Sequence, residues 1–206
     1  MYVGRIVAVG MTSKPFVAYR VSSRSFPNRV ARITDVGVAI QPLDAEDLKK
    51  NPYIAYNCIR VSKNGVVVSN GSHTDPIWEK LEGGVEPETA LSDVLAEMGY
   101  ERDELNTPRI AGIVKDSVGY IGIVRPDKVE TAHFDLKPNS CRIICTYEMN
   151  KIEDKDYPFF AGTPLEAAKY VIDGGIFENL EKPICAAAWM EKLAVFNPFE
   201  VGERKG

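Results

Sequence analysis

The sequence has few of the residues that mark disulfide-rich, nucleic-acid-binding or metal-binding proteins. Its 206 residues include four cysteines and two histidines, and its formal net charge is -4. Four cysteines are too sparse for a small secreted disulfide scaffold, and an acidic chain lacks the broad basic face that nucleic acids require. We therefore expect reduced cysteines and no nucleic-acid partner.

Long apolar runs and nucleotide-cofactor motifs are also missing. No run reaches the roughly 18 residues that span a bilayer, and the first ten residues, MYVGRIVAVG, contain neither a basic leader nor a small-residue cleavage site. We expect no membrane partner and a cytoplasmic location. Because the chain has no Walker loop and no G-x-G-x-x-G pattern, we expect no triphosphate or dinucleotide cofactor.

Cys141 and Cys145 are the candidates for a metal-binding pair. The surrounding segment, SCRIICTYEM, reads as a strand, which places residues four apart roughly 13 Å from each other. His73 and His133 add no cluster of the kind that zinc sites use. We therefore expect structural cysteines and no metal site.

Short apolar runs separated by turn-forming residues predict a strand-rich chain. The clearest feature is a hairpin within residues 53–72 around Asn64-Gly65. Helices are expected within 43–51, 86–99 and 163–175, whereas 183–196 fits a helix or a strand, with a strand favoured for its first half. Eight or nine strands with helices set apart predict an α+β fold of antiparallel sheets covered by helices, as one domain over residues 1–206.

The segment AYRVSSRSFPNR, residues 18–29, concentrates cations and hydroxyls in an otherwise acidic chain. Arginine forks and serine hydroxyls are typical phosphate ligands, although basic residues also protect an edge strand from pairing. Edge protection accounts for the charges but not for the serines and the asparagine, so a local anion site is the favoured interpretation. The candidate ligands are Arg20, Ser22, Ser23, Arg24, Ser25, Asn28 and Arg29.

Three other places offer polar side chains that could take part in chemistry. Tyr56 and Asn57 are adjacent in a predicted strand and face opposite sides unless a bulge intervenes, which favours a core role for the tyrosine. The segment SNGSHTDP, residues 69–76, could supply an acid or a base, but its composition is also that of an ordinary turn. The candidates in this segment are Asn70, Gly71, Ser72, His73 and Asp75. The third place is Arg109, at the start of a later predicted strand.

Five strings of this sequence closely resemble the archaeal type of inosine monophosphate (IMP) cyclohydrolase: MYVGRIVAVG, AYRVSSRSFPNR, YNCIRVS, SNGSHTDPI and NTPRIAG. The likeness runs nearly from end to end. It implies the four-layered αββα sandwich of N-terminal nucleophile hydrolases. It also implies closure of the second purine ring, in which formylated aminoimidazole carboxamide ribonucleotide (FAICAR) gives IMP and water.

The resemblance also implies roles for the candidate residues. The arginine-serine segment, with Arg20, Ser22, Ser23, Arg24, Ser25 and Asn28, is expected on the phosphate and ribose, and Asn70, Gly71, Ser72 and Arg109 complete the substrate contacts. Arg29, Tyr56 and Asn57 are expected on the base and formyl group, with His73 and Asp75 as candidates for proton transfer. Because the chain begins Met1-Tyr2 and not with Cys, Ser or Thr, we expect no covalent intermediate.

Two other classes of protein remain open on the sequence. An amidohydrolase of the same fold would need a nucleophile at its mature terminus, and a nucleotide sensor would bind FAICAR or IMP without closing a ring. The expected partners are this small-molecule substrate and product. Antiparallel sheet edges and an acidic surface are also compatible with a homo-oligomer.

Overall fold

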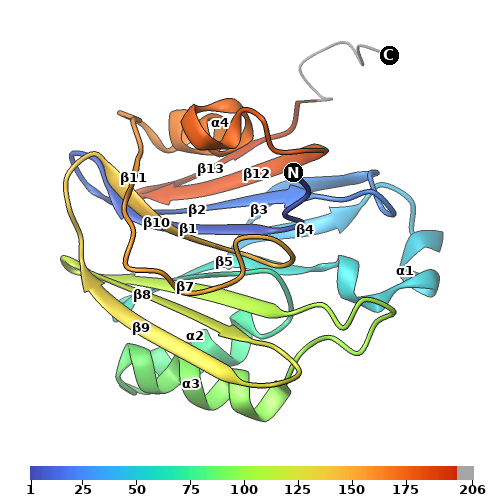
Figure 1. Ribbon diagram of the computed structural model, residues 1–206, viewed down its shortest axis with the longest axis horizontal. Helices are drawn as coiled ribbons and strands as arrows, with labels where there is room; N and C mark the ends of the chain where they lie inside the picture. The colour runs from blue at the N-terminus through green and yellow to red at the C-terminus, as the bar shows by residue number, and fades with distance from the viewer. Residues whose placement is uncertain (199–206) are drawn as a thin grey trace.

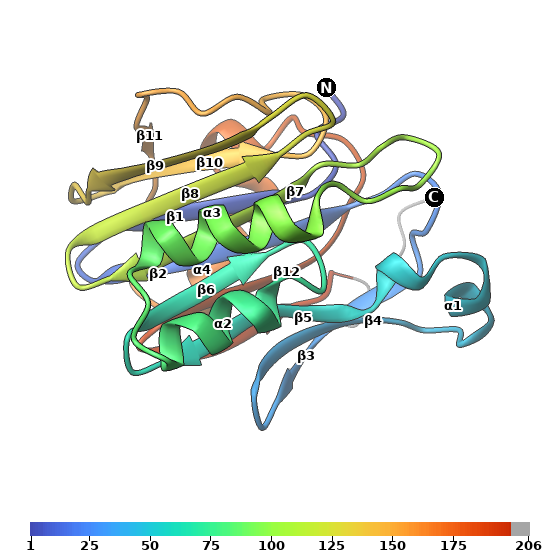
Figure 2. The same cartoon turned by 90° about the horizontal axis from the view of Figure 1, so that it is seen from below.

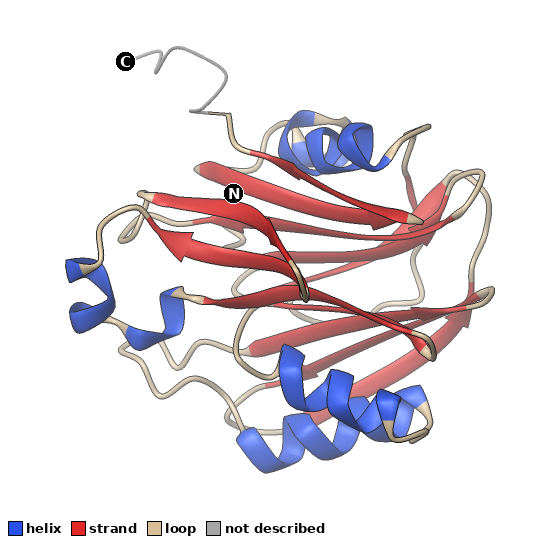
Figure 3. Ribbon diagram, turned by 180° about the vertical axis from the view of Figure 1, so that it is seen from behind, coloured by secondary structure: helices blue, strands red, loops and turns tan. Residues whose placement is uncertain are grey.

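The computed structural model describes residues 1–198, so residues 199–206 of the expected domain lie outside the described part. Two antiparallel sheets are stacked face to face, and helices cover the outer face of each (Figures 1 and 3). The predicted α+β class is confirmed. The number of strands was underestimated, because thirteen are present among the described residues.

Each sheet combines neighbouring hairpins with pairings between distant segments. The six-stranded sheet has the order β11 (Tyr157–Pro158), β10 (Ser140–Cys145), β1 (Ile6–Met11), β2 (Pro15–Ser22), β12 (Pro183–Met190) and β13 (Lys192–Phe196). The seven-stranded sheet follows chain order: β3 (Arg29–Thr34), β4 (Gly37–Pro42), β5 (Tyr56–Ser62), β6 (Gly65–Ser69), β7 (Arg109–Lys115), β8 (Val118–Val124) and β9 (Val129–Asp135).

The longer helices form the two outer layers. α4 (Pro164–Asp173) packs on β2, β12 and β13 of the six-stranded sheet, whereas α2 (Thr74–Glu82) and α3 (Pro87–Met98) cover the seven-stranded sheet. Thr163 caps α4 by accepting a hydrogen bond from the Glu166 N–H at 3.2 Å. The short helix α1 (Glu46–Lys50) and the 3-10 turn Pro52–Ile54 project from one end (Figure 2).

Layers on both sides explain why the inner strands are apolar on both faces. In β6, Val66 and Val68 face the other sheet, while Val67 packs beneath α2 and α3. The thiols of Cys141 and Cys145 lie in the apolar cluster under α4, as expected for structural cysteines. None of the helices within residues 1–198 has the length and apolar character needed to cross a bilayer.

Local predictions were confirmed with two corrections. The β5–β6 hairpin exists, but Ser62 pairs with Gly65, so its loop is Lys63-Asn64 and Gly65 begins β6 with a φ of 140°. No helix was predicted over residues 74–82, but they form α2, because Ile77 and Leu81 bury one face of a helix. Strands β12 and β13 account for the ambiguous final segment.

The edge strand β3 is covered at its centre by a side chain from near the end of the described chain. Asn197 accepts a hydrogen bond from the Ala31 N–H at 2.9 Å and donates one to the Ala31 carbonyl at 3.1 Å. The Asn197 side-chain amide thereby satisfies the N–H and the carbonyl of Ala31, which point away from the sheet. The edge remains a strand edge but lacks free hydrogen-bonding groups at Ala31.

Candidate active site

Strand ends and loops enclose a two-part cavity at the end of the sandwich where α1 lies. The start of β1, the loop after β2, the turn before β5 and the loop before β7 meet there. The inner chamber has a volume of about 60 Å³ and is lined by Tyr2, Arg5, Ser23, Ser25, Phe26, Arg29, Asn51, Tyr53, Ile54, Glu101, Asp103, Leu105 and Tyr147. It adjoins an outer chamber of about 460 Å³, lined by Ser25, Phe26, Lys50, Asn51, Pro52, Tyr53, Arg102, Asp103, Glu104 and Leu105.

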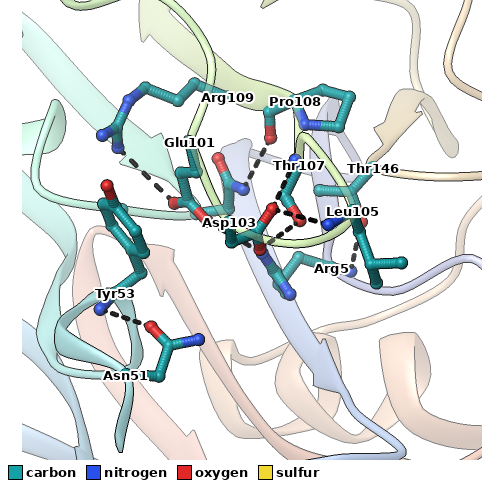
Figure 4. A network of polar contacts seen from close by, with 12 residues as sticks. Arg5, Asn51, Tyr53, Glu101, Asp103, Leu105, Thr107, Pro108, Arg109 and Thr146 are labelled. Atoms are coloured by element: carbon teal, nitrogen blue, oxygen red, sulfur yellow. Dashed lines mark hydrogen bonds and ion pairs between the residues drawn. The ribbon is translucent and has the colours of Figure 1, made fainter. Parts of the chain in front are cut away.

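A buried carboxyl group joins two arginines beside the inner chamber (Figure 4). One oxygen of Glu101 lies 3.3 Å from Arg5 Nη2, and the other lies 3.5 Å from Arg109 Nη1. Glu101 is 1% exposed. Burial raises its pKa from 4.5 to about 7, although Arg5 and Arg109 act in the opposite direction. The carboxyl can therefore hold or release a proton near neutral pH.

Arg5 and Arg109 each have a buried N–H donor without a hydrogen-bond partner in the described chain. Arg5 Nε and Arg109 Nε are buried, and neither makes a hydrogen bond to any residue of the described chain. A buried N–H group without a partner costs free energy unless water or a ligand satisfies it. Because Arg5 lines the inner chamber, its Nε marks the chamber as a place where a polar or anionic group can bind.

His73 supports this cluster as a neutral side chain. Its Nε2 lies 3.0 Å from the Ile110 carbonyl, so this nitrogen carries the proton, and Nδ1 can then accept from Arg109 Nη1 at 3.5 Å. Burial and the adjacent Arg109 lower the pKa of His73 from 6.5 to about 3. The geometry thus suits the positioning of Arg109 better than the proton transfer expected from the sequence.

Arg29 at the start of β3 and Tyr56 at the start of β5 were both expected on the base and formyl group, but only Arg29 lines a chamber. Arg29 lines the chamber and donates from Nε to the Phe26 carbonyl at 3.1 Å. The Tyr56 hydroxyl lies 2.7 Å from that of Tyr19 between the sheets, which agrees with the expected core role. Burial raises the pKa of Tyr56 to about 12, although Arg29 and Arg5 partly oppose this, so the phenol keeps its proton.

Arg20 and Ser22 are buried inside the protein and line neither chamber. Arg20 is fully buried below the end of α4, where Nε donates to Ser22 Oγ at 2.9 Å. Its two Nη groups donate to five backbone carbonyl oxygens, those of Val171, Ile172, Phe177, Leu180 and Glu181. The guanidinium is thus occupied by carbonyls at and after the end of α4, and Arg20 lines neither chamber.

The rest of the arginine-serine segment divides between the chamber and the surface. Ser23 and Ser25 line the inner chamber. Arg24 is exposed and forms an ion pair with Glu181 at 2.6 Å, and Asn28 is exposed with its carbonyl accepting from the Leu43 N–H. The structure therefore brings Ser23, Ser25 and Arg29 together and leaves Arg24 and Asn28 outside.

The candidate residues around the start of α2 also lie in different surroundings. Asn70 is buried and ties its loop to β7 through the Ile110 N–H and the Pro108 carbonyl, and Ser72 is exposed. Gly71 is adjacent to the Glu101–Arg109 pair. Asn57 and Asp75 contact each other at 2.9 Å, with Arg60 at 2.7 Å from Asp75, in a cluster between β5 and α2. That cluster does not line either chamber.

Several residues of the site were missed by sequence reasoning. Arg5 interrupts the apolar string around β1, and a charge in such a place is informative because lone charges are rarely buried. Glu101 follows the Gly99 end of α3 within a charge-rich segment, which gives no comparable signal.

Within residues 1–198, no group of three His, Cys, Asp or Glu side chains is arranged to hold a metal ion.

The protein is thus an α+β sandwich of two sheets with a cavity lined by charged and polar side chains. The family model described as IMP cyclohydrolase-like protein matches residues 2–194. The chain belongs to this family.

Relatives match over nearly their full lengths. The IMP cyclohydrolase of Methanocella arvoryzae is 44% identical, covering 100% of this chain and 99% of the relative. The IMP cyclohydrolase of Methanocaldococcus jannaschii is 45% identical, covering 93% and 95%. That of Methanothrix thermoacetophila is 40% identical, covering 96% and 100%.

We expect Gly71→Ala to disturb the carboxyl cluster directly. A Cβ at Gly71 would lie 2.9 Å from both Arg109 Nη1 and Glu101 Oε1, and 3.2 Å from His73 Nδ1. Because these groups are buried, they can move only by losing their mutual contacts. We predict a fall in kcat of at least about tenfold, since small misplacements of reacting groups are costly. Steady-state kinetics of ring closure would measure it.

Gly83→Ala is the matched control, because a Cβ there would have its nearest contact, Lys80 O, at 3.4 Å. Thermal unfolding of both variants separates a local effect from loss of fold. If Gly71→Ala keeps the wild-type kcat, the cluster has no part in the reaction.

Proposed function

We propose that this protein is an IMP cyclohydrolase that converts FAICAR to IMP and water. The observation that carries the proposal is the buried Glu101 carboxyl, held between Arg5 and Arg109 with a pKa of about 7 beside the inner chamber. The full-length similarity to proteins named IMP cyclohydrolase supports the same reaction.

Ring closure needs one proton removed and one oxygen protonated. The carboxamide nitrogen forms a bond to the formyl carbon and loses a proton, while the formyl oxygen becomes a hydroxyl group. Loss of that hydroxyl with the proton of the formamido nitrogen releases one water and leaves the new C=N bond. A carboxyl with a pKa near 7 can accept the first proton and deliver it to the oxygen.

The surrounding residues fit the remaining demands of the reaction. Arg5 and Arg29 line the inner chamber and supply donors for the developing oxyanion. The chamber, at about 60 Å³, suits only the reacting end of the substrate, where the formamide and the carboxamide are adjacent. Holding these two arms together supplies much of the rate in favourable intramolecular reactions, roughly 7 to 11 kcal/mol.

We further propose that the two stacked sheets with their outer helices form a sandwich of the N-terminal nucleophile hydrolase type, used here without such a nucleophile. The shared apolar cluster between the sheets supports a single domain. A cytoplasmic location and a homo-oligomeric state stay proposals from the sequence.

The test is to mix the purified protein with FAICAR, in the presence of a chelator and without folate or other nucleotides. We expect IMP to appear well above the uncatalysed rate. Binding of FAICAR and IMP without catalysed closure would contradict the proposal and indicate a nucleotide sensor.

A further inference from the structure

The outer chamber carries groups for which ring closure has no use. Its volume of about 460 Å³ falls within the range of small-molecule sites. Phe26 and Tyr53 contribute aromatic side chains to its lining, and Lys50 and Arg102 contribute two cations. Lys50 comes from α1 and Arg102 from the loop after α3, so two separate segments bring positive charge to one cavity.

The sizes of the two chambers set how a ribonucleotide can bind. The inner chamber is too small for more than the reacting end, so the ribose and the phosphate must lie in the outer one. The two chambers are adjacent, because they share six lining residues: Ser25, Phe26, Asn51, Tyr53, Asp103 and Leu105. The Ser25 hydroxyl at this boundary is suited to the ribose.

The chamber lining also holds two carboxylates, Asp103 and Glu104, and within residues 1–198 neither forms an ion pair with Lys50 or Arg102. Asp103 accepts hydrogen bonds from the Thr107 hydroxyl at 2.7 Å and from the Thr107 N–H at 2.8 Å, so its oxygens serve its own loop. Lys50 pairs with Asp47 at 2.9 Å on the exposed surface of α1, and such pairs exchange readily. Glu104 is exposed at the rim of the same chamber.

We propose that Lys50 and Arg102 form the subsite for the 5'-phosphate of the substrate. The inference rests on the proposed function for the identity of the nucleotide. It moves the phosphate away from Arg20, which is occupied by five carbonyls, and from Arg24, which pairs with Glu181. A phosphate dianion between a lysine and an arginine makes charge-assisted hydrogen bonds to both.

Binding of IMP and of inosine tests the subsite, because the two ligands differ only by the phosphate. We expect calorimetry to show that wild type prefers IMP. Lys50→Ala and Arg102→Ala should each lower the IMP-to-inosine affinity ratio about tenfold, and the double variant more. Lys49→Ala is the matched control, because Lys49 is on the same helix, pairs with Glu46 and does not line the chamber.

Catalysis by the same proteins separates this inference from the proposed function. If wild type closes FAICAR but the double variant keeps the wild-type IMP-to-inosine ratio, the subsite is wrong and the function stands. If wild type closes no ring while the two substitutions still remove the preference for IMP, the subsite stands and the function is wrong.

Discussion

Glu101→Gln is expected to lower kcat for FAICAR closure by about 10² to 10⁴, the range over which a positioned acid or base contributes. The amide keeps the shape of the side chain but cannot take the proton from the carboxamide nitrogen. Its contacts with Arg5 and Arg109, at 3.3 and 3.5 Å in wild type, can in part persist. Steady-state and single-turnover rates would measure the loss in the chemical step.

The pH profile provides the sharper readout of this substitution. If the carboxylate is the base, wild-type kcat should rise with pH through about 7, the pKa of Glu101, and level off above it. Glu101→Gln should lack this rise. Glu97→Gln, on the exposed face of α3, is the control and should retain it. A variant at position 101 with the wild-type profile would assign the proton transfer to another group.

The same carboxyl predicts an opposite trend for stability. The folded-state pKa is raised from 4.5 to about 7, so ionisation is harder in the folded state. The associated stability is therefore fully present below pH 4.5 and is lost as the pH rises through about 7. At about 1.36 kcal/mol per pKa unit, the loss is on the order of 3 kcal/mol. Relative to wild type, Glu101→Gln should gain unfolding free energy between pH 5 and 8, as denaturant titrations can show.

Arg20→Met is expected to destabilise the protein by more than about 4 kcal/mol. The substitution keeps much of the side-chain volume but removes the donors of five backbone carbonyls around the end of α4. A buried polar group left without a partner costs about 1 to 3 kcal/mol, so several together are severe. Chemical denaturation, or the soluble yield if the variant does not fold, is the measurement.

Arg20→Lys distinguishes this structural role from phosphate binding. A lysine keeps the charge, but its single nitrogen cannot reach all five carbonyls. We expect a large loss of stability with little change in KM for FAICAR at a temperature where the variant is folded. Arg24→Ala, which removes an exposed arginine, should leave the melting temperature close to that of wild type. A raised KM in folded Arg20→Lys would instead favour the role expected from the sequence.

The position of Arg20 shows what the sequence could predict and what it could not. Strand alternation places Arg20 on the face opposite Tyr19 and Val21, which pack between the sheets. The pattern therefore predicts that Arg20 lies away from the inter-sheet space. It cannot predict the carbonyls of residues 171–181, because that contact depends on how a distant helix ends.

The site itself was predictable only in part, for a similar reason. The cluster in residues 69–76 was recognised as polar, and Arg109 was recognised as a candidate. Glu101, which connects Arg109 to Arg5, lies in a loop whose position follows from the packing of α3 and β7. Its raised pKa arises from burial, which the composition of a charged segment does not indicate.

The Asn197–Ala31 contact has a consequence for how molecules of this protein meet at high concentration. An uncovered edge strand can template the addition of a strand from another chain, which is a route to aggregation. Here the side-chain amide occupies both backbone groups of Ala31 in the manner of a neighbouring strand. A second molecule would have to displace the Asn197 amide before it could extend the seven-stranded sheet at Ala31. The contact therefore disfavours strand addition between molecules at this edge.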